Sequence, residues 1–84
     1  MDTDTDADHS PKDTNPTLIG SVQRALRIVE ALHAEGAITA KRLSRLTGIP
    51  LPTTYHLLRT LSHEGYVHRD QGAFRLTEGL PLAS

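Results

Sequence analysis

A glycine- and proline-rich break between two amphipathic segments constrains the fold of this chain more than any other feature. The break is Gly48-Ile49-Pro50. Gly48 can adopt the left-handed conformation that ends a helix, and Pro50 prevents the helix from continuing. The apolar stripes predicted to face inward are Ala40, Leu43 and Leu46 before the break and Thr54, Leu57, Leu58 and Leu61 after it. Two short helices joined around a glycine are typical of a helix-turn-helix, which we place at about residues 40–61.

A longer amphipathic segment precedes the helix-turn-helix. We predict a helix over about Val22–Ala34, with Ser21 as its N-cap and Gly36 as its stop signal. Its predicted buried face consists of Val22, Ala25, Leu26, Ile28, Val29 and Leu32. The link 37–39 is short enough to form a single β-bridge, and its last residue, Thr39, is the expected N-cap of the next helix.

A β-hairpin is predicted after the helix-turn-helix. In residues 74–77, Phe74 and Leu76 alternate with polar residues, as expected of a half-buried strand, and residues 66–69 would supply its partner. Asp70-Gln71-Gly72 is a suitable turn because Gly72 can take a positive φ. The predicted fold is therefore mainly α with a small antiparallel β-hairpin: a three-helix winged helix-turn-helix, with the wing at about residues 66–77.

Charge divides the chain into an acidic leader and a mildly basic body. Residues 1–20 contain five Asp and one Lys, a net charge of −4, and have almost no apolar content. We expect this leader to be disordered, because it cannot bury enough apolar surface to offset its ordering entropy. Residues 21–78 are the predicted winged domain, and residues 79–84 the start of a linker. The leader either competes with DNA for the basic face or is a solvated extension.

Several function classes are disfavoured by what the sequence lacks. It contains no cysteine, so disulfides and thiolate metal sites are excluded. No apolar run approaches the roughly 20 residues needed to cross a bilayer, so a cytoplasmic, nucleoid-associated protein is expected. The five histidines do not have metal-ligand spacing, and no phosphate loop, nucleophile elbow or paired carboxylate is present. We therefore expect no enzyme, no cofactor and no metal.

The second helix of the helix-turn-helix, predicted at about residues 52–64, presents small, polar, aromatic and basic residues outward. Such a surface fits the major groove of DNA, with residues of the first two turns reaching base edges. Residues 69–75 of the wing would then reach the adjacent backbone or minor groove. The candidate DNA-binding residues are Arg24, Lys41, Arg42, Pro52, Thr53, Tyr55, His56, Arg59, Arg69, Gln71 and Arg75.

Some of these candidates have a purely structural interpretation as well. Lys41 and Arg42 lie at the positive end of a helix dipole, where a DNA phosphate would stabilise them but solvent can also screen them. Tyr55 could be part of the core, and His56 could be an ordinary surface residue. A winged helix can also serve as a protein-docking module, because a fold does not fix a function. The position of the charges distinguishes the two functions: for DNA binding five basic residues should share one face, whereas protein docking does not require this. They are Lys41, Arg42, Arg59, Arg69 and Arg75.

Taken in order, the motifs of the body resemble the DNA-binding domain of the IclR family of bacterial transcriptional regulators. The segments that carry the resemblance are Ser21–Val29, Leu46–Pro50, Thr53–Leu61, Glu64–Val67 and Phe74–Leu76. They span residues 21 to about 82, nearly the whole body. The chain departs from the family pattern at Leu51, Pro52 and His56, so the resemblance implies the mode of docking and not the base preference.

The resemblance implies sequence-specific binding of double-stranded DNA by a transcriptional repressor or activator. Family members are usually longer and carry a C-terminal effector-binding domain after a linker helix. We therefore expect a palindromic operator as partner, with pairing of two copies either on DNA or through that missing domain. A small-molecule effector would bind only in the missing domain. Alone, the chain is expected to be a monomer or a weak dimer.

Overall fold

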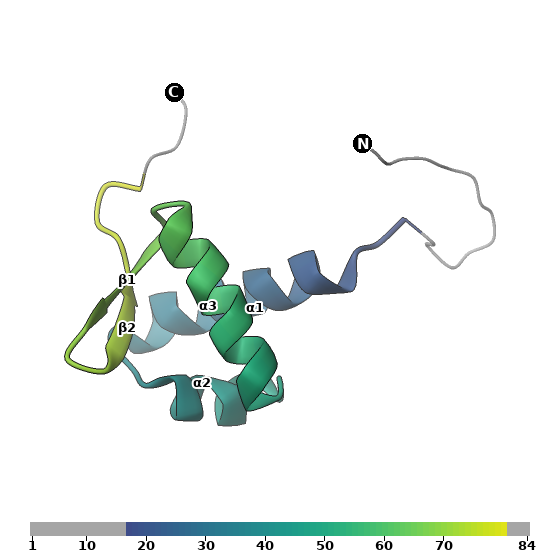
Figure 1. Cartoon of the computed structure of the whole chain (residues 1–84), viewed down its shortest axis with the longest axis horizontal. Helices are drawn as coiled ribbons and strands as arrows, with labels where there is room; N and C mark the ends of the chain where they lie inside the picture. Colours follow the sequence, from purple (N-terminus) through teal and green to yellow (C-terminus); the bar gives the residue numbers. More distant parts are fainter. Residues whose placement is uncertain (1–16, 81–84) are drawn as a thin grey trace.

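The structure, a computed structural model, describes residues 17–80 and contains three helices followed by a two-stranded hairpin (Figure 1). The elements are α1 (Gly20–Glu35), α2 (Ala40–Thr47), α3 (Leu51–His63), β1 (Val67–Asp70) and β2 (Ala73–Leu76). This is the order of a winged helix-turn-helix, so the predicted fold class is confirmed. The predicted disorder covers residues 1–20. Residues 1–16 of this leader lie outside the described residues, whereas Gly20 is already the first residue of α1 and Ile19 is its N-cap. Of the predicted linker 79–84, residues 81–84 also lie outside the described residues.

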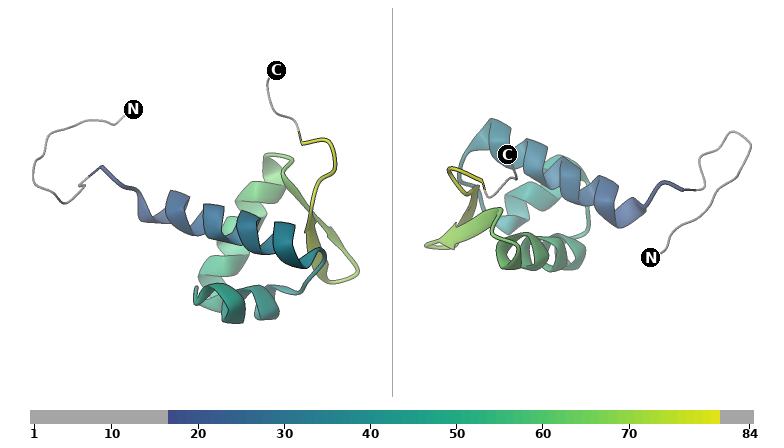
Figure 2. Two further views of the ribbon diagram at one scale, coloured as in Figure 1. Left: turned by 180° about the vertical axis from the view of Figure 1, so that it is seen from behind. Right: turned by 90° about the horizontal axis from the view of Figure 1, so that it is seen from above.

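The helices enclose the core together with the hairpin, which we call the wing (β1, β2 and their turn). α1 passes behind α3 in Figure 1 and in front of it when the molecule is turned by 180° (Figure 2). β1 packs against α3, and β2 packs against α1. The buried apolar residues are Ile28, Leu32, Ile38, Ala40, Leu43, Ile49, Leu58, Val67 and Phe74. Every element thus contributes to one core, and the orientation of α3 is fixed by helices and wing together.

Side-chain hydroxyls fix the turn between α2 and α3. Gly48 has φ 76° and ψ 8°, the predicted left-handed C-cap of α2. The carbonyl oxygen of Ile49 accepts hydrogen bonds from Ser44 Oγ at 2.6 Å and from Thr54 Oγ1 at 3.3 Å. The amide of Ile49 donates to Thr47 Oγ1 at 3.3 Å. Because these bonds connect both helices to one turn residue, they hold the start of α3 at a defined angle to α2.

The helix boundaries differ from the predicted ones at two starts. The predicted N-cap Ser21 lies inside α1, which begins at Gly20 with Ile19 as an N-cap that makes no side-chain hydrogen bond. α3 begins at Leu51, so Pro52 is its second residue; both positions tolerate proline because neither amide has an intrahelical acceptor. The cap of α2 is confirmed, since Thr39 Oγ1 accepts from the Arg42 amide at 3.2 Å.

Three residues predicted to face the core are exposed. Val22 and Leu26 of α1 are 52% and 57% exposed, and Leu46 of α2 is 49% exposed. The N-terminal half of α1 extends past α3, away from the wing, so α3 covers only part of the apolar stripe (Figures 1 and 2). α2 has only 8 residues, and its core contacts are made by Ala40 and Leu43. Helical periodicity gives the apolar face, but a neighbouring element must lie against that face to bury it.

The wing has a two-residue turn. Val67 pairs with Leu76 and Asp70 with Ala73, which leaves Gln71 and Gly72 as the turn residues. Gln71 has φ 55° and Gly72 has φ 85°. Positive φ at both central positions is characteristic of a type I′ turn. The predicted β-bridge is also confirmed, because Ile38 pairs with Phe74 and thereby attaches the α1–α2 link to the wing.

The turn provides a stability prediction at Gln71. Asparagine tolerates the left-handed conformation better than glutamine does, so Gln71→Asn should stabilise the domain by about 0.5 kcal/mol, or about 2–4 °C in Tm. Gln71→Val should destabilise it by about 1–2 kcal/mol, because a β-branched residue is strained at positive φ. Thermal unfolding followed by circular dichroism without DNA measures both. Any stability order other than Asn above Gln above Val would contradict this turn geometry.

Candidate nucleic-acid interface

The outer face of α3 carries most of the candidate residues. Thr54 and Leu58 are 0% and 1% exposed, and they anchor the inner face of the helix. Pro52, His56 and Arg59 are exposed, Tyr55 is 43% exposed, and Thr53 is half-buried. The first two turns of α3 therefore present a small, polar and aromatic surface to a partner. The interpretation of Tyr55 as a core residue does not agree with its exposure.

A cleft separates α3 from the wing and brings two candidate cations together. Arg59 on α3 and Arg69 on β1 both line it, beside Tyr55 and Ser62. Leu58 and Phe74 supply the apolar lining, and the Arg69 guanidinium carbon lies 5.3 Å from the centre of the Phe74 ring. This cation–π contact holds the Arg69 side chain at the cleft. Among residues 17–80, neither arginine forms an ion pair, and both place positive charge at the cleft.

The start of α2 carries the next two candidates. Lys41 and Arg42 are both exposed in the first turn of α2, which contains no acidic residue. Arg42 lies 3.6 Å from Glu35 at the end of α1, an ion pair whose side chains are 53% and 36% exposed. An exposed pair of this kind contributes less than about 1 kcal/mol. A phosphate could therefore compete with Glu35 for Arg42 at little cost.

The remaining candidates do not share this cleft. Arg75 pairs with His68 across the hairpin, and this pair lies on the opposite sheet face from Arg69 and Phe74 because side chains alternate along a strand. Arg75 lines a separate cleft beside His33, His68 and Glu78. Arg24 is exposed on α1, and Gln71 lies in the wing turn. Of the five basic residues expected on one face, the structure thus brings only Arg59 and Arg69 to a single cleft.

Among residues 17–80, no three histidine or acidic side chains are grouped so that they could hold a metal ion. No helix in this range is long and apolar enough to cross a membrane.

Comparison with known proteins assigns this arrangement to a family. The model of the IclR helix-turn-helix domain matches residues 21–71, from the second residue of α1 to the wing turn. The chain belongs to the IclR family. The resemblance inferred from the sequence is therefore confirmed. Membership of this family supports DNA binding by an IclR-type domain. No curated protein shows a significant sequence match to this IclR-family chain.

Two solved structures share the winged fold of this IclR-family chain. An IclR family transcriptional regulator from Brucella abortus matches with a TM-score of 0.72 and 25% sequence identity, over 77% of this chain and 26% of that regulator. The Zalpha domain of Carassius auratus PKZ, solved in complex with Z-DNA, matches with a TM-score of 0.68 and 18% identity. That match covers 70% of this chain and 100% of the Zalpha domain. The chain thus corresponds to about a quarter of the Brucella regulator's length.

Sequence reasoning missed several residues that shape the interface. Ser62 and Phe74 line the cleft, and Ser44 and Thr47 fix the turn before α3. Hydroxyl residues that flank a helix break are a recognisable signal, because they often bond to nearby backbone groups. The contact between Arg69 and Phe74 left no comparable signal, since it depends on the register of the wing.

Proposed function

We propose that this chain binds double-stranded DNA in a sequence-specific manner, with α3 in the major groove and the wing on the adjacent backbone or minor groove. The observation that carries the proposal is the placement of Arg59 and Arg69, from two different elements, at one cleft beside the polar first turns of α3. A site for a small apolar ligand would not be expected to present two guanidinium groups. A polyanion that follows the molecular surface accounts for both groups.

The proposed contacts divide into two sets by their position. Pro52, Thr53, Tyr55 and His56 occupy the first two turns of α3 and would face base edges, where hydroxyl, ring and methyl groups distinguish base pairs. Arg59 and Arg69 would each contact a phosphate of the strand that lies between α3 and the wing. Further phosphate or groove contacts are proposed for Arg24, Lys41, Arg42, Gln71 and Arg75.

The biological role follows from the family. We propose that the chain is the DNA-binding domain of a cytoplasmic transcriptional regulator, a repressor or an activator, that recognises a palindromic operator as a pair of copies. Two half-sites about one helical turn apart would match the symmetry of such a pair. A small-molecule effector would act through a separate effector-binding domain and not through residues 21–78.

The two contact sets should respond differently to mutation. Thr53→Ala and His56→Ala should change which sequences are preferred, at a cost of about 1–3 kcal/mol on the best site, because they remove base readout. Arg59→Ala and Arg69→Ala should weaken all sequences alike and lower the slope of log affinity against log salt by about one each. Selection of bound duplexes from a random pool, followed by titrations at several salt concentrations, measures both effects.

Arg27→Ala is the matched control for the arginine variants. Arg27 is exposed on α1, outside the proposed contacts, and its loss changes the net charge by the same amount as the loss of Arg69. Equal effects of Arg27→Ala and Arg69→Ala would mean that net charge matters and the cleft does not. If the folded wild-type chain failed to bind any duplex at about 50 mM salt, the alternative of a protein-docking module would be favoured instead.

A further inference from the structure

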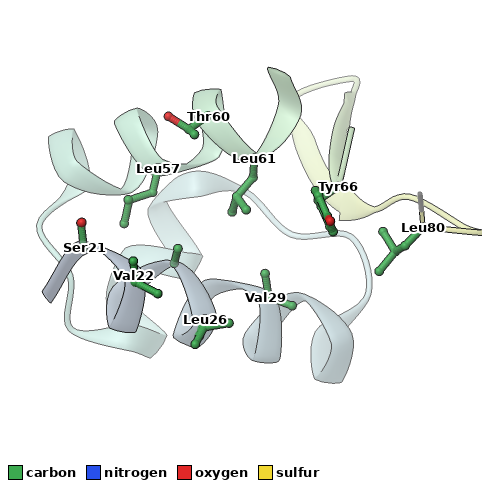
Figure 3. A pocket seen from close by; sticks show the side chains of 10 residues that line it. Ser21, Val22, Leu26, Val29, Leu57, Thr60, Leu61, Tyr66 and Leu80 are labelled. Atoms are coloured by element: carbon green, nitrogen blue, oxygen red, sulfur yellow. The ribbon is translucent and has the colours of Figure 1, made fainter. Parts of the chain in front are cut away.

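Two further clefts differ in chemistry from the proposed interface. The first lies between α1 and α3, where Leu57 and Leu61 point toward α1 and Val22 lines the other side (Figure 3). Among residues 17–80, no charged side chain lines this apolar cleft, so it has no group that would orient a charged ligand. The second lies between the end of α1 and the wing, and we call it the α1–wing cleft. Its volume of about 420 Å³ is within the range of small-molecule sites.

The α1–wing cleft combines opposite charges with an apolar floor. The side chains that line it are Leu32, His33, His68, Arg75, Leu76 and Glu78. The two leucines are buried or half-buried and form the floor, whereas the four polar side chains are exposed. Among residues 17–80, Arg75 and Glu78 form no ion pair with each other, although both line the cleft. Each of these two charges can therefore contact a ligand.

The basic side of the cleft favours an anionic group. His68 and Arg75 are directly opposite each other on the two strands, so both side chains leave the same face of the hairpin. When His68 is protonated, like charges at such positions destabilise a hairpin, and a carboxylate between them would reverse the sign of this contribution. A guanidinium group is also suited to a carboxylate, because it can donate two parallel hydrogen bonds. His33, in the last turn of α1, supplies a further donor.

The acidic side of the cleft favours a cationic group. Glu78 provides a carboxylate there. The cleft also lies at the C-terminal end of α1, where the last backbone carbonyl groups carry partial negative charge. An ammonium group at this side would be stabilised by the carboxylate and by the helix end together. The cleft thus provides for one anionic and one cationic group of the same ligand.

We propose that the α1–wing cleft binds a free α-amino acid with an aliphatic side chain. Its carboxylate would contact Arg75 and His68, and its ammonium group would contact Glu78. Its side chain would lie on the floor of Leu32 and Leu76. A ligand that is only anionic would be repelled by Glu78, and an uncharged apolar ligand would desolvate both charges without pairing them. This ligand is distinct from the effector proposed for a separate domain, because it does not contact α3.

The expected affinity is low, because the ligand is small and the polar side chains of the cleft are exposed. A dissociation constant on the order of 1 mM is expected. Titration of the ¹⁵N-labelled full chain with L-leucine, followed by two-dimensional NMR spectra, measures it. The amide signals of His33, His68 and Arg75 should shift and reach saturation. The absence of a saturable shift up to about 20 mM would overturn the proposal.

Three related compounds test the proposed contacts one at a time. N-acetyl-L-leucine lacks the ammonium charge, L-leucinamide lacks the carboxylate, and glycine lacks the aliphatic side chain. Each should bind at least about tenfold more weakly than L-leucine, because each loses a charge-assisted hydrogen bond or the apolar contact. Equal binding of N-acetyl-L-leucine would contradict the proposed contact with Glu78. Shifts confined to Val22, Leu26 and Leu57 would place L-leucine in the apolar cleft and would also overturn the proposal.

Variants of the chain test the same contacts from the protein side. Arg75→Gln and Glu78→Gln should each weaken the binding of L-leucine about tenfold, since each removes one charged partner. Arg27→Gln and Glu64→Gln are the matched controls, because both residues are exposed and lie outside the cleft. Circular dichroism verifies that all four variants are folded. Equal losses in Arg75→Gln and Arg27→Gln would mean that only net charge matters, and would contradict the proposed site.

The consequence for DNA rests on the proposed function, in which Arg75 is one of the phosphate or groove contacts. Saturating L-leucine should occupy Arg75 and lower the slope of log affinity against log salt by about one. The NMR titrations need no DNA, so the two proposals can fail separately. A chain that binds L-leucine but no duplex would refute the proposed function and support this site. A chain that binds duplex but not L-leucine would refute this site alone.

Discussion

The affinity of the chain for duplex DNA is expected to fall by about 250- to 1,000-fold when the salt concentration rises from 50 to 200 mM. Each phosphate that a Lys or Arg neutralises releases condensed counterions, and about five such contacts give a slope near −4 to −5 in a log–log plot. The five residues are Lys41, Arg42, Arg59, Arg69 and Arg75. Fluorescence anisotropy of a labelled duplex at four or five salt concentrations measures this slope.

The positions of these residues make the slope informative. Arg59 and Arg69 line one cleft, whereas Arg75 lies on the other face of the hairpin and Arg42 is paired with Glu35. A slope near −2 would indicate that the cleft alone contacts phosphate. No salt dependence at all would remove the electrostatic basis of the proposed function.

Replacing Leu58 by alanine is expected to unfold a large share of the molecules at 25 °C. Leu58 is 1% exposed at the centre of α3, and truncating such a residue costs about 2–5 kcal/mol. A domain of this size rarely gains more than about 3–5 kcal/mol from its core, so the loss equals most of the total stability. Urea unfolding followed by far-UV circular dichroism gives the difference in the free energy of unfolding.

Leu46→Ala is the control for this prediction, because it makes the same chemical change at a site that is 49% exposed. Its cost should be well below that of Leu58→Ala, since an exposed truncation removes little buried area and leaves no cavity. Similar costs at the two sites would mean that Leu58 is not buried in the core as described.

Local signals in the sequence predicted the elements of this fold well. The break at Gly48-Ile49-Pro50, the Thr39 cap and the wing turn at Gly72 each depend on a few neighbouring residues and their backbone preferences. Such preferences act over three or four residues, so they can be read without a structure. Two helix starts were placed slightly too late: α1 begins at Gly20 although Ser21 was the predicted cap, and α3 begins at Leu51 and not at Pro52.

The candidate interface was predictable as a set of residues but not as a surface. The outer face of α3 follows from periodicity, and the structure exposes Tyr55, His56 and Arg59 there. The meeting of Arg59 with Arg69, and the separation of Arg75 from both, depend on the packing of β1 against α3. The alternation of side chains along a strand shows which residues share a face. Which of those residues reach the cleft depends on the hairpin register and on the face of the hairpin that packs against the helices.

The sequence by itself determined the order of the elements, the break before α3 and the composition of its outer face. Only the tertiary structure decided which apolar residues are buried: Ile28 and Leu32 enter the core, whereas Val22 and Leu26 on the same stripe remain exposed. The physical reason is that periodicity defines the direction of a side chain relative to its own helix. Burial depends on where another element crosses that helix, and α3 leaves the N-terminal half of α1 uncovered (Figure 1).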